Sequence, residues 1–266
     1  MTGFPLAWLD PVLDRCRSEI LHGHGLRKWT KVGTGGRLDQ VTDLDLAIER
    51  QLIAASLSAY PTAAILSEET HADPAALASD LCFVIDPIDG TKEMIAGRTD
   101  FAISVAVFQL GRPVAGVLDV PHRSQRFTCA VGFGARLNGR PLRLAEAPTL
   151  ELARIAVSSA QRVEPSLLLS WRRLCAGTLV PVGALTPKVA QVLVGDCHAA
   201  IYLPTPGKTA FIWDYAAAAL LLAEAGGTLI SFDGSSLLRT LPVEHPGGWI
   251  AGRSAICHQI RHSLQK

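Results

Sequence analysis

A chain of 266 residues with 25 Lys and Arg against 24 Asp and Glu carries a formal net charge of +1. This near balance provides no basic surface for a nucleic acid polymer and no polybasic patch for a membrane, so a small molecule is the expected ligand. A hydrophobic content of 48% with only 6% aromatic residues indicates an ordered α/β or α+β protein rather than a disordered chain.

Cysteine usage and the N-terminus predict a cytoplasmic protein. The six cysteines are scattered and form no C-x-x-C pair, which is typical of reduced thiols in the cytosol. Asp10 and Asp14 lie where a signal peptide would need an apolar core. The sequence has no apolar run of about 18 residues, so we expect no membrane span.

Two helices are predicted first. Residues 5–22 repeat apolar side chains with the period of an amphipathic helix. His22 and His24 follow, but no third ligand is near them, so the sequence favours a flexible helix exit over a metal site. The glycine-rich segment 31–37 lacks the order of a nucleotide P-loop, and a mobile hairpin near the functional site is left open for it. The second helix begins after Thr42, a natural N-cap.

Two short strands are then expected to end in carboxylates. An apolar run over residues 63–67 leads into Glu68 and Glu69, and a second run over 81–85 ends at Asp86. As parallel neighbours, the two strands would bring both sets of carboxylates to one edge of the sheet. Ligands of open α/β sheets bind at that edge.

The turn after the second strand combines acidic residues with a helix start. Pro87 cannot extend a sheet ladder, so we expect the strand to stop and to leave Asp86 and Asp89 in a tight turn. Gly90 and Thr91 then open a helix, whose unpaired N–H groups and dipole favour an anion such as phosphate. One turn could therefore hold cations and an anion side by side.

The remaining elements suggest two domains. An N-terminal α+β domain over residues 1–150 would carry most of the metal ligands, and a C-terminal α/β domain over 151–266 would supply further contacts. The polar segment 140–151, with two prolines, is the predicted linker. Further strands are expected at 101–108, 114–120, 125–131, 155–159 and 179–182, and helices at 165–175 and 187–194. Asn138 and Gly139 predict a hairpin turn.

The last predicted helix starts near residue 212 and is rich in Ala and Leu. We interpret Asp214 as its N-cap, and Gly226 and Gly227 as its end. A helix this apolar must be buried, but it is too short to span a bilayer. An aspartate at its start could present a ligand from the second domain to a cation in the first.

The candidate ligands have only oxygen donors. They are Glu69, Asp86, Asp89 and Asp214. Carboxylates without His or Cys suit Mg²⁺ rather than Zn²⁺. Beside an anion-binding helix start, two such ions could bind a phosphate ester, orient a water for in-line attack and stabilise the leaving oxygen. Asp45, or the hydroxyl of Thr91, could take a proton from that water.

Four ordered motifs resemble the inositol monophosphatase superfamily of Mg²⁺-dependent, lithium-sensitive phosphatases. They are V-T-D-L-D at 41–45, S-E-E at 67–69, D-P-I-D-G-T at 86–91 and W-D-Y-A-A at 213–217. The resemblance implies a layered α-β-α-β-α sandwich and two to three Mg²⁺ ions. It implies that Glu69, Asp86 and the carbonyl of Ile88 hold the first ion. Asp86, Asp89 and Asp214 would hold the second.

The resemblance also implies catalytic and substrate-binding roles. Asp45 and Thr91 would activate the water, and Glu69 would share a third, looser ion. The amides of Gly90 and Thr91 would contact the phosphate. The predicted substrate contacts are Asp89, Gly90, Thr91, Gly183, Ala184 and Lys188.

Within the superfamily, the chain is most similar to the 3′(2′),5′-bisphosphate nucleotidases of sulfur metabolism, which convert adenosine 3′,5′-bisphosphate to AMP and phosphate. The similarity rests on D-G-T-K-E-M at 89–94 and A-I-Y-L at 200–203. Three positions depart from that branch. Met94 replaces a frequent Phe, Ala184 replaces a small hydroxyl residue, and Lys188 falls one place later than in several members.

Other activities remain open. An inositol-1-monophosphatase or a histidinol-phosphatase would use the same metal site, although Gly207 stands where inositol monophosphatases usually have an acidic residue. A haloacid-dehalogenase-type phosphatase is disfavoured, because the aspartates are spaced D-x-x-D rather than D-x-D. A relative that binds metal or nucleotide without catalysis is the alternative from another class. The expected partner is a small phosphorylated metabolite, and a homodimer is left open.

Overall fold

The computed structural model describes residues 3–22, 27–32, 38–159, 178–203 and 209–264. The predicted helix 165–175, His24, Gly207 and the glycines of segment 31–37 lie outside the described residues. Within the described part of the chain, no helix is both long and apolar enough to cross a membrane.

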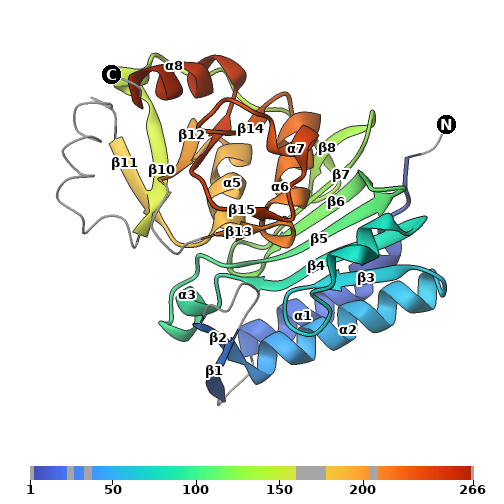
Figure 1. The fold of residues 1–266 in the computed structure, drawn as a ribbon. Helices are drawn as coiled ribbons and strands as arrows, with labels where there is room; N and C mark the ends of the chain where they lie inside the picture. Colours follow the sequence, from blue (N-terminus) through green and yellow to red (C-terminus); the bar gives the residue numbers. More distant parts are fainter. Residues whose placement is uncertain (1–2, 23–26, 33–37, 160–177, 204–208, 265–266) are drawn as a thin grey trace.

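Two sheets and three layers of helices form the predicted α-β-α-β-α sandwich (Figure 1). The larger sheet has the order β3 (Ala64–Ser67), β4 (Leu81–Asp89), β5 (Ala102–Gln109), β6 (Arg112–Val120), β7 (Gln125–Ala130), β8 (Gly134–Leu137) and β9 (Arg140–Leu142). The smaller sheet has the order β11 (Thr178–Val182), β10 (Arg154–Ser158), β12 (Ala199–Tyr202), β16 (Trp249–Gly252) and β14 (Thr228–Ser231).

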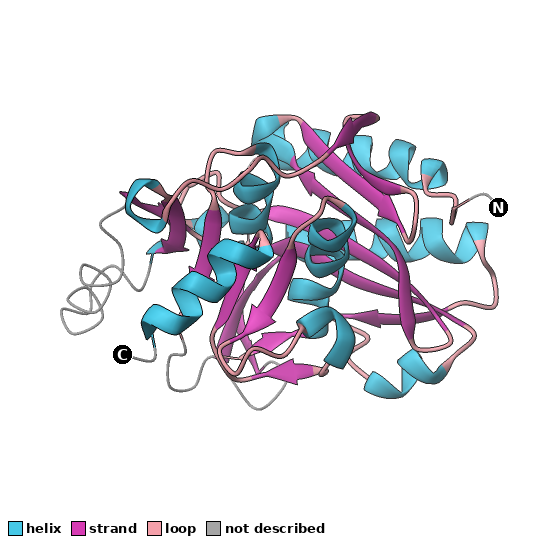
Figure 2. Ribbon diagram, turned by 90° about the horizontal axis from the view of Figure 1, so that it is seen from above, coloured by secondary structure: helices cyan, strands magenta, loops and turns pink. Residues whose placement is uncertain are grey.

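Helices cover both faces of each sheet, as Figure 2 shows from above. The helices are α1 (Asp10–His22), α2 (Asp43–Ala59), α3 (Thr91–Ile95), α5 (Leu185–Val194), α6 (Ile212–Glu224), α7 (Leu237–Thr240) and α8 (Ser254–Leu264). Two further antiparallel pairs join β1 (Lys28–Val32) to β2 (Leu38–Thr42) and β13 (Ala210–Phe211) to β15 (Glu244–His245). The helices and strands predicted within the described residues are present, including the hairpin turn at Asn138 and Gly139 between β8 and β9.

Strand β4 differs from its prediction because it does not stop at Asp86. It continues through Pro87 to Asp89, and its pairing with β5 shifts register between Asp86 and Asp89. Such an irregularity leaves a residue out of the ladder, so a proline that lacks an N–H is tolerated there. The two aspartates therefore end a strand with a bulge instead of sharing a turn.

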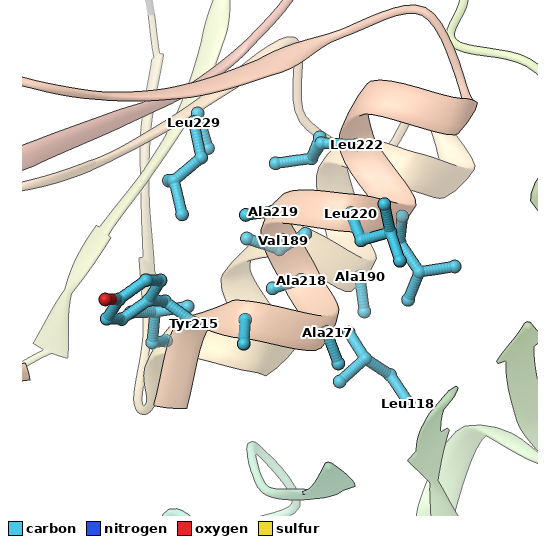
Figure 3. Packing of buried hydrophobic residues seen from close by; sticks show 14 of the residues in the cluster. Leu118, Val189, Ala190, Tyr215, Ala217, Ala218, Ala219, Leu220, Leu222 and Leu229 are labelled. Carbon is cyan, nitrogen blue, oxygen red and sulfur yellow. The ribbon is translucent and has the colours of Figure 1, made fainter. Parts of the chain in front are cut away.

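The central layer, α5 and α6, is packed closely between the sheets. Ala218 and Ala219 of α6 lie near Val189 and Ala190 of α5, while Ala217 lies next to Leu118 of β6 (Figure 3). Small side chains let the backbones approach, and a Cβ at Gly116 of β6 would lie 3.3 Å from the Cα of Ala217. The largest buried cluster takes residues from both sides of residue 150. The predicted domain boundary stays a prediction.

A buried charge network attaches α1 to the large sheet. The carboxylate of Asp119 on β6 is fully buried and accepts hydrogen bonds from Arg17 of α1 at 3.1 and 2.8 Å and from Arg126 of β7 at 2.7 Å. Arg126 also donates to Asp10 and Asp14 of α1, at 2.8 and 2.7 Å. Charge-assisted hydrogen bonds thus satisfy this buried aspartate completely.

Candidate metal centre

Three carboxylates from distant parts of the chain meet at one edge of the large sheet. Glu68 directly follows β3, Asp86 lies in β4 and Asp214 lies in the first turn of α6. One carboxylate oxygen of each lies within 4.8 Å of the others. Because β3 and β4 are parallel neighbours, the ends of both strands reach the same edge, as the sequence predicted.

Asp86 is the central residue of this cluster. It is 1% exposed, and among the described residues no group donates a hydrogen bond to either of its carboxylate oxygens. Burial raises the pKa of Asp86, and the charges of Glu68, Asp89 and Asp214 raise it further. An uncompensated buried carboxylate is costly, and a hard cation bound by oxygen ligands removes that cost. The donor set therefore fits a divalent metal ion such as Mg²⁺.

The structure brings Glu68 to the cluster, whereas the sequence prediction had named Glu69. The carboxylate of Glu69 instead forms an ion pair with Lys31 of β1. Burial raises the pKa of Glu69 to about 7 even though Lys31 acts to lower it. We therefore correct the candidate ligand from Glu69 to Glu68.

The period of the strands explains this correction. Side chains two residues apart share a face of a sheet. Leu66 and Val84 pack in the cluster that contains α6, so Glu68 and Asp86, each two residues further on, project towards α6 and Asp214. Counting alternate residues back from Glu68 and Asp86 would have found this in the sequence.

Asp214 reaches the cluster from inside α6, and not as its N-cap. Phe211 is the N-cap, and Asp214 is the third residue of the helix. Its carboxylate Oδ2 accepts a hydrogen bond of 2.7 Å from the main-chain N–H of Phe211. This bond satisfies an otherwise unpaired amide of the helix start and fixes the direction of the aspartate.

The structure brings the predicted pair Asp45 and Thr91 into contact. Asp45 forms a capping box with Thr42, whose N–H and hydroxyl donate to Oδ2 at 2.7 and 2.5 Å. The hydroxyl of Thr91 lies 2.8 Å from Asp45 Oδ1 and 3.1 Å from the carbonyl oxygen of Ile88. Burial raises the pKa of Asp45, while the hydrogen bonds from Thr42 and Thr91 oppose this increase. A carboxylate with a raised pKa is a better proton acceptor.

Asp89 lies beside the three-carboxylate cluster and is held from the second half of the chain. Its Oδ2 accepts hydrogen bonds of 2.6 Å from both the N–H and the hydroxyl of Thr186 in α5. Burial raises the pKa of Asp89, and the bonds from Thr186 and the charge of Lys188 oppose this. Next to it, Gly90 has φ +111°, and a Cβ there would lie 2.9 Å from the carbonyl oxygen of Asp100. Only glycine fits this position without strain.

Lys188 is a buried cation at the predicted substrate loop. Its ammonium group donates to the carbonyl oxygens of Gly183 and Ala184 at 2.5 and 2.7 Å, and lies 5.9 Å from the ring centroid of Trp249. Burial lowers the pKa of Lys188 to about 8, although the charge of Asp89 acts to raise it. The ammonium group therefore holds the backbone of Gly183 and Ala184 in place.

A pocket of about 240 Å³ connects the cluster with this loop. Nine of the predicted site residues line it: Asp86, Ile88, Asp89, Gly90, Thr91, Gly183, Ala184, Lys188 and Asp214. Glu68, which the prediction had not named as a site residue, also lines it. Asp45 contacts the pocket residue Thr91, and Glu69 pairs with Lys31.

A five-layer α/β sandwich in which Glu68, the buried Asp86 and Asp214 meet where the large sheet contacts α6 has a candidate site for an oxygen-ligated metal ion. Residues 17–265 match the profile of the Inositol monophosphatase family. The chain belongs to that family.

Relatives with two different names resemble the chain. The Nus factor SuhB of Pseudomonas aeruginosa is 36% identical over 205 residues, which cover 74% of each chain. The inositol-1-monophosphatase of Bacillus subtilis is 30% identical over 202 residues, again 74% of each chain. Neither of these relatives is named a bisphosphate nucleotidase, the branch to which the sequence analysis had found the chain most similar.

Solved structures support the fold. The extragenic suppressor protein suhB of Bartonella henselae is 27% identical, with a TM-score of 0.76 over 96% of this chain and 93% of its own. An IMPase of Thermotoga maritima is 22% identical, with a TM-score of 0.80 over 98% and 97%. The layered α-β-α-β-α fold predicted from the sequence is confirmed.

Proposed function

We propose that the protein is a Mg²⁺-dependent phosphomonoesterase that hydrolyses a small phosphorylated metabolite. The observation that carries the proposal is the Asp86 carboxylate, buried among Glu68 and Asp214 without a hydrogen-bond donor from the described residues. Membership of the inositol monophosphatase family supports the same activity. The reaction joins a water oxygen to phosphorus, breaks the ester P–O bond and leaves the alcohol protonated.

The metal ligands that we propose are Glu68, Asp86 and Asp214, with Asp89 and the carbonyl of Ile88 at the adjoining position. Two to three Mg²⁺ ions remain the expected number. When bound, Mg²⁺ offsets the charge of the phosphate and lowers the pKa of a coordinated water. Asp214 keeps its orientation through the amide of Phe211, and Asp89 keeps its own through Thr186.

Asp45 and Thr91 form the proton acceptor in this proposal. The Thr91 hydroxyl takes a proton from the attacking water and passes its own proton to Asp45 Oδ1, 2.8 Å away. Asp45 is buried and its Oδ2 is held by Thr42, so only Oδ1 faces Thr91. A carboxylate with a raised pKa suits this step near neutral pH.

For the substrate, we propose an inositol monophosphate first. The B. subtilis relative, named an inositol-1-monophosphatase, supports this choice. A second candidate is a 3′(2′),5′-bisphosphate nucleotide, because the buried ammonium of Lys188 lines the pocket and would favour a second anionic group. Histidinol phosphate is a third ester to compare.

Phosphate release from the three esters tests both the Mg²⁺-dependent activity and the choice of substrate. The wild-type protein is assayed in parallel with inositol 1-phosphate, adenosine 3′,5′-bisphosphate and histidinol phosphate, each with and without Mg²⁺. We expect Mg²⁺-dependent release, inhibition by Li⁺, and the highest kcat/KM with inositol 1-phosphate. A preference for the bisphosphate would restore the nucleotidase interpretation and make Lys188 its specificity residue.

The non-catalytic alternative gives a different result in the same assay. A protein that only binds metal would show Mg²⁺-dependent stabilisation but no phosphate release from any of the three esters. Asp86→Asn serves as the background control, since a contaminating phosphatase would survive this substitution. Release that is equal in wild type and Asp86→Asn would refute the proposed activity.

A further inference from the structure

We propose that Glu49 is a positioning residue that holds Glu68 in the metal cluster. Glu49 lies in α2, one helical turn beyond Asp45, and is fully buried. It was not among the predicted site residues, and it does not line the pocket. The inference rests on the proposed metal site and is independent of which ester is the substrate.

Both oxygens of the Glu49 carboxylate bind the turn that contains Glu68. Oε1 accepts the main-chain N–H groups of Glu69 and Thr70, at 3.0 and 3.2 Å, and also the hydroxyl of Ser67. Oε2 accepts the hydroxyl of Thr70 at 2.6 Å. A buried carboxylate that receives four hydrogen bonds is a strong local anchor.

These four bonds flank Glu68 on both sides. Ser67 precedes Glu68 in the chain, and Glu69 and Thr70 follow it. Glu49 therefore holds the neighbours of Glu68 towards α2. The main-chain N–H of Glu68 donates to the carbonyl oxygen of Ile85 in β4 at 3.2 Å, which ties the turn to the strand that carries Asp86. With its neighbours held on the α2 side, the side chain of Glu68 projects to the opposite face, towards Asp86 and Asp214.

A carboxylate suits this arrangement better than an amide. Glutamine at position 49 keeps the shape of glutamate but has one acceptor oxygen, and its NH₂ group can only donate. In its better orientation the amide oxygen accepts the N–H groups of residues 69 and 70 without the charge of a carboxylate, and the NH₂ group faces Thr70, whose hydroxyl can then accept from residue 49 but no longer donate to it. Glu49→Gln therefore loosens the turn without leaving a cavity.

Direct measurement of metal affinity tests the proposal. Mg²⁺ and Mn²⁺ are titrated into wild type and Glu49→Gln by isothermal titration calorimetry, at a temperature at which circular dichroism shows both to be folded. We expect about 10-fold weaker binding in the variant, the lower end of the range for residues that orient metal ligands. An affinity that stays within about twofold of wild type would overturn the proposal.

Asp119→Asn is the matched control. Asp119 is also a fully buried carboxylate with several donors, but it faces α1 and has no contact with the turn at residues 67–70. We expect a lower melting temperature and an unchanged metal affinity. If Asp119→Asn weakened metal binding as much as Glu49→Gln, general loosening of the fold would explain the effect and the proposal would fail.

If Glu49→Gln does not fold, a less disruptive substitution provides the same test. Thr70→Val removes the hydroxyl donor to Oε2 and the 2.6 Å contact of that hydroxyl with His71 Nδ1, but it keeps the main-chain N–H. We expect weaker metal binding than in wild type, by a smaller factor than in Glu49→Gln; no change would overturn the proposal. Phosphate release at saturating Mg²⁺ is measured separately. If the wild-type protein binds metal but hydrolyses none of the esters, the proposed function is refuted. The measured metal affinities of the variants would still decide whether Glu49 positions Glu68.

Discussion

Asp86 and Asp119 are both buried carboxylates on strands of the same sheet, but their surroundings are opposite. Asp119 faces α1 and receives hydrogen bonds from the guanidinium groups of Arg17 and Arg126. Asp86 faces α6, where its neighbours are the acidic side chains of Glu68 and Asp214, and no described residue donates to it. One charge is compensated by the chain and the other is not.

This difference separates a structural charge from a functional one. A buried charge costs several kcal/mol unless partners repay its desolvation, so an uncompensated carboxylate persists only where something else stabilises it. Asp119 uses its partners to hold α1 on the sheet. In the proposed metal site, a bound cation would supply the compensation that Asp86 does not receive from the described residues.

The largest expected effect is that of Asp86→Asn. We expect phosphate release to fall by about 10³-fold or more, because the metal ions supply several kcal/mol of transition-state stabilisation. Without metal, the same substitution should stabilise the fold by about 1 to 3 kcal/mol, since it removes a buried carboxyl group whose ionised form has no partner and whose pKa is raised. Assays with Mg²⁺ and urea unfolding in EDTA measure the two effects. A destabilised Asp86→Asn would show that Asp86 is compensated after all.

Asp119→Asn should have the opposite effect on stability. Loss of the charge leaves Arg17 and Arg126 without their buried partner, and we expect the free energy of unfolding to fall by about 3 kcal/mol. The kcat of phosphate release should stay close to that of wild type below the melting temperature. Urea unfolding gives the first quantity. A stability equal to that of wild type would mean that Asp10 and Asp14 alone hold Arg126 and with it α1.

Lys188 is a buried charge that lies between these two cases, because it has hydrogen-bond acceptors but its pKa is still lowered by burial. We expect a smaller effect of this residue on stability, and one that depends on pH. Burial lowers its pKa to about 8 from an ordinary value of 10.5. Between these values the unfolded chain binds more protons than the folded one, so the contribution of Lys188 to stability rises with pH and is lost as pH falls through 8. At about 1.4 kcal/mol per pKa unit, the rise amounts to at most about 3.5 kcal/mol.

Lys188→Met removes the titrating group and provides the measurement. Urea unfolding of wild type and variant at pH 7, 8, 9 and 10 gives the difference in their free energies of unfolding. We expect this difference to change with pH in favour of wild type up to about pH 10 and to stay constant below pH 7. A difference that does not vary with pH would contradict a lowered pKa for Lys188.

Local rules were sufficient to predict most of the described fold. Thr42 is the N-cap of α2 because a side-chain oxygen at that position satisfies an unpaired amide, and this rule needs no tertiary information. The parallel pairing of β3 and β4 was assumed in the sequence argument, and the structure shows it. The pair Asp45 and Thr91 was named from motif resemblance, and the structure brings the two residues to hydrogen-bond distance.

The errors arose where tertiary contacts override a local rule. Pro87 lies inside β4 because a shift in pairing with β5 removes the need for its N–H, and that shift involves the partner strand. Asp214 caps α6 from its third position, since the amide it binds belongs to Phe211. The choice of Glu69 instead of Glu68 was different, because alternate residues in β3 and β4 place Glu68 and Asp86 on one face and the sequence alone could have shown it.

The metal cluster joins Glu68 and Asp86, which are close in the chain, to Asp214, which arrives only with α6 near the C-terminal end. A nascent or truncated chain that ends before α6 possesses two of the three carboxylates and cannot complete the cluster. During refolding, metal capture should therefore come late, after α6 has docked between the two sheets. The cation would act as a reporter of complete assembly, and a metal-sensitive fluorescence signal should lag behind the recovery of helical circular dichroism.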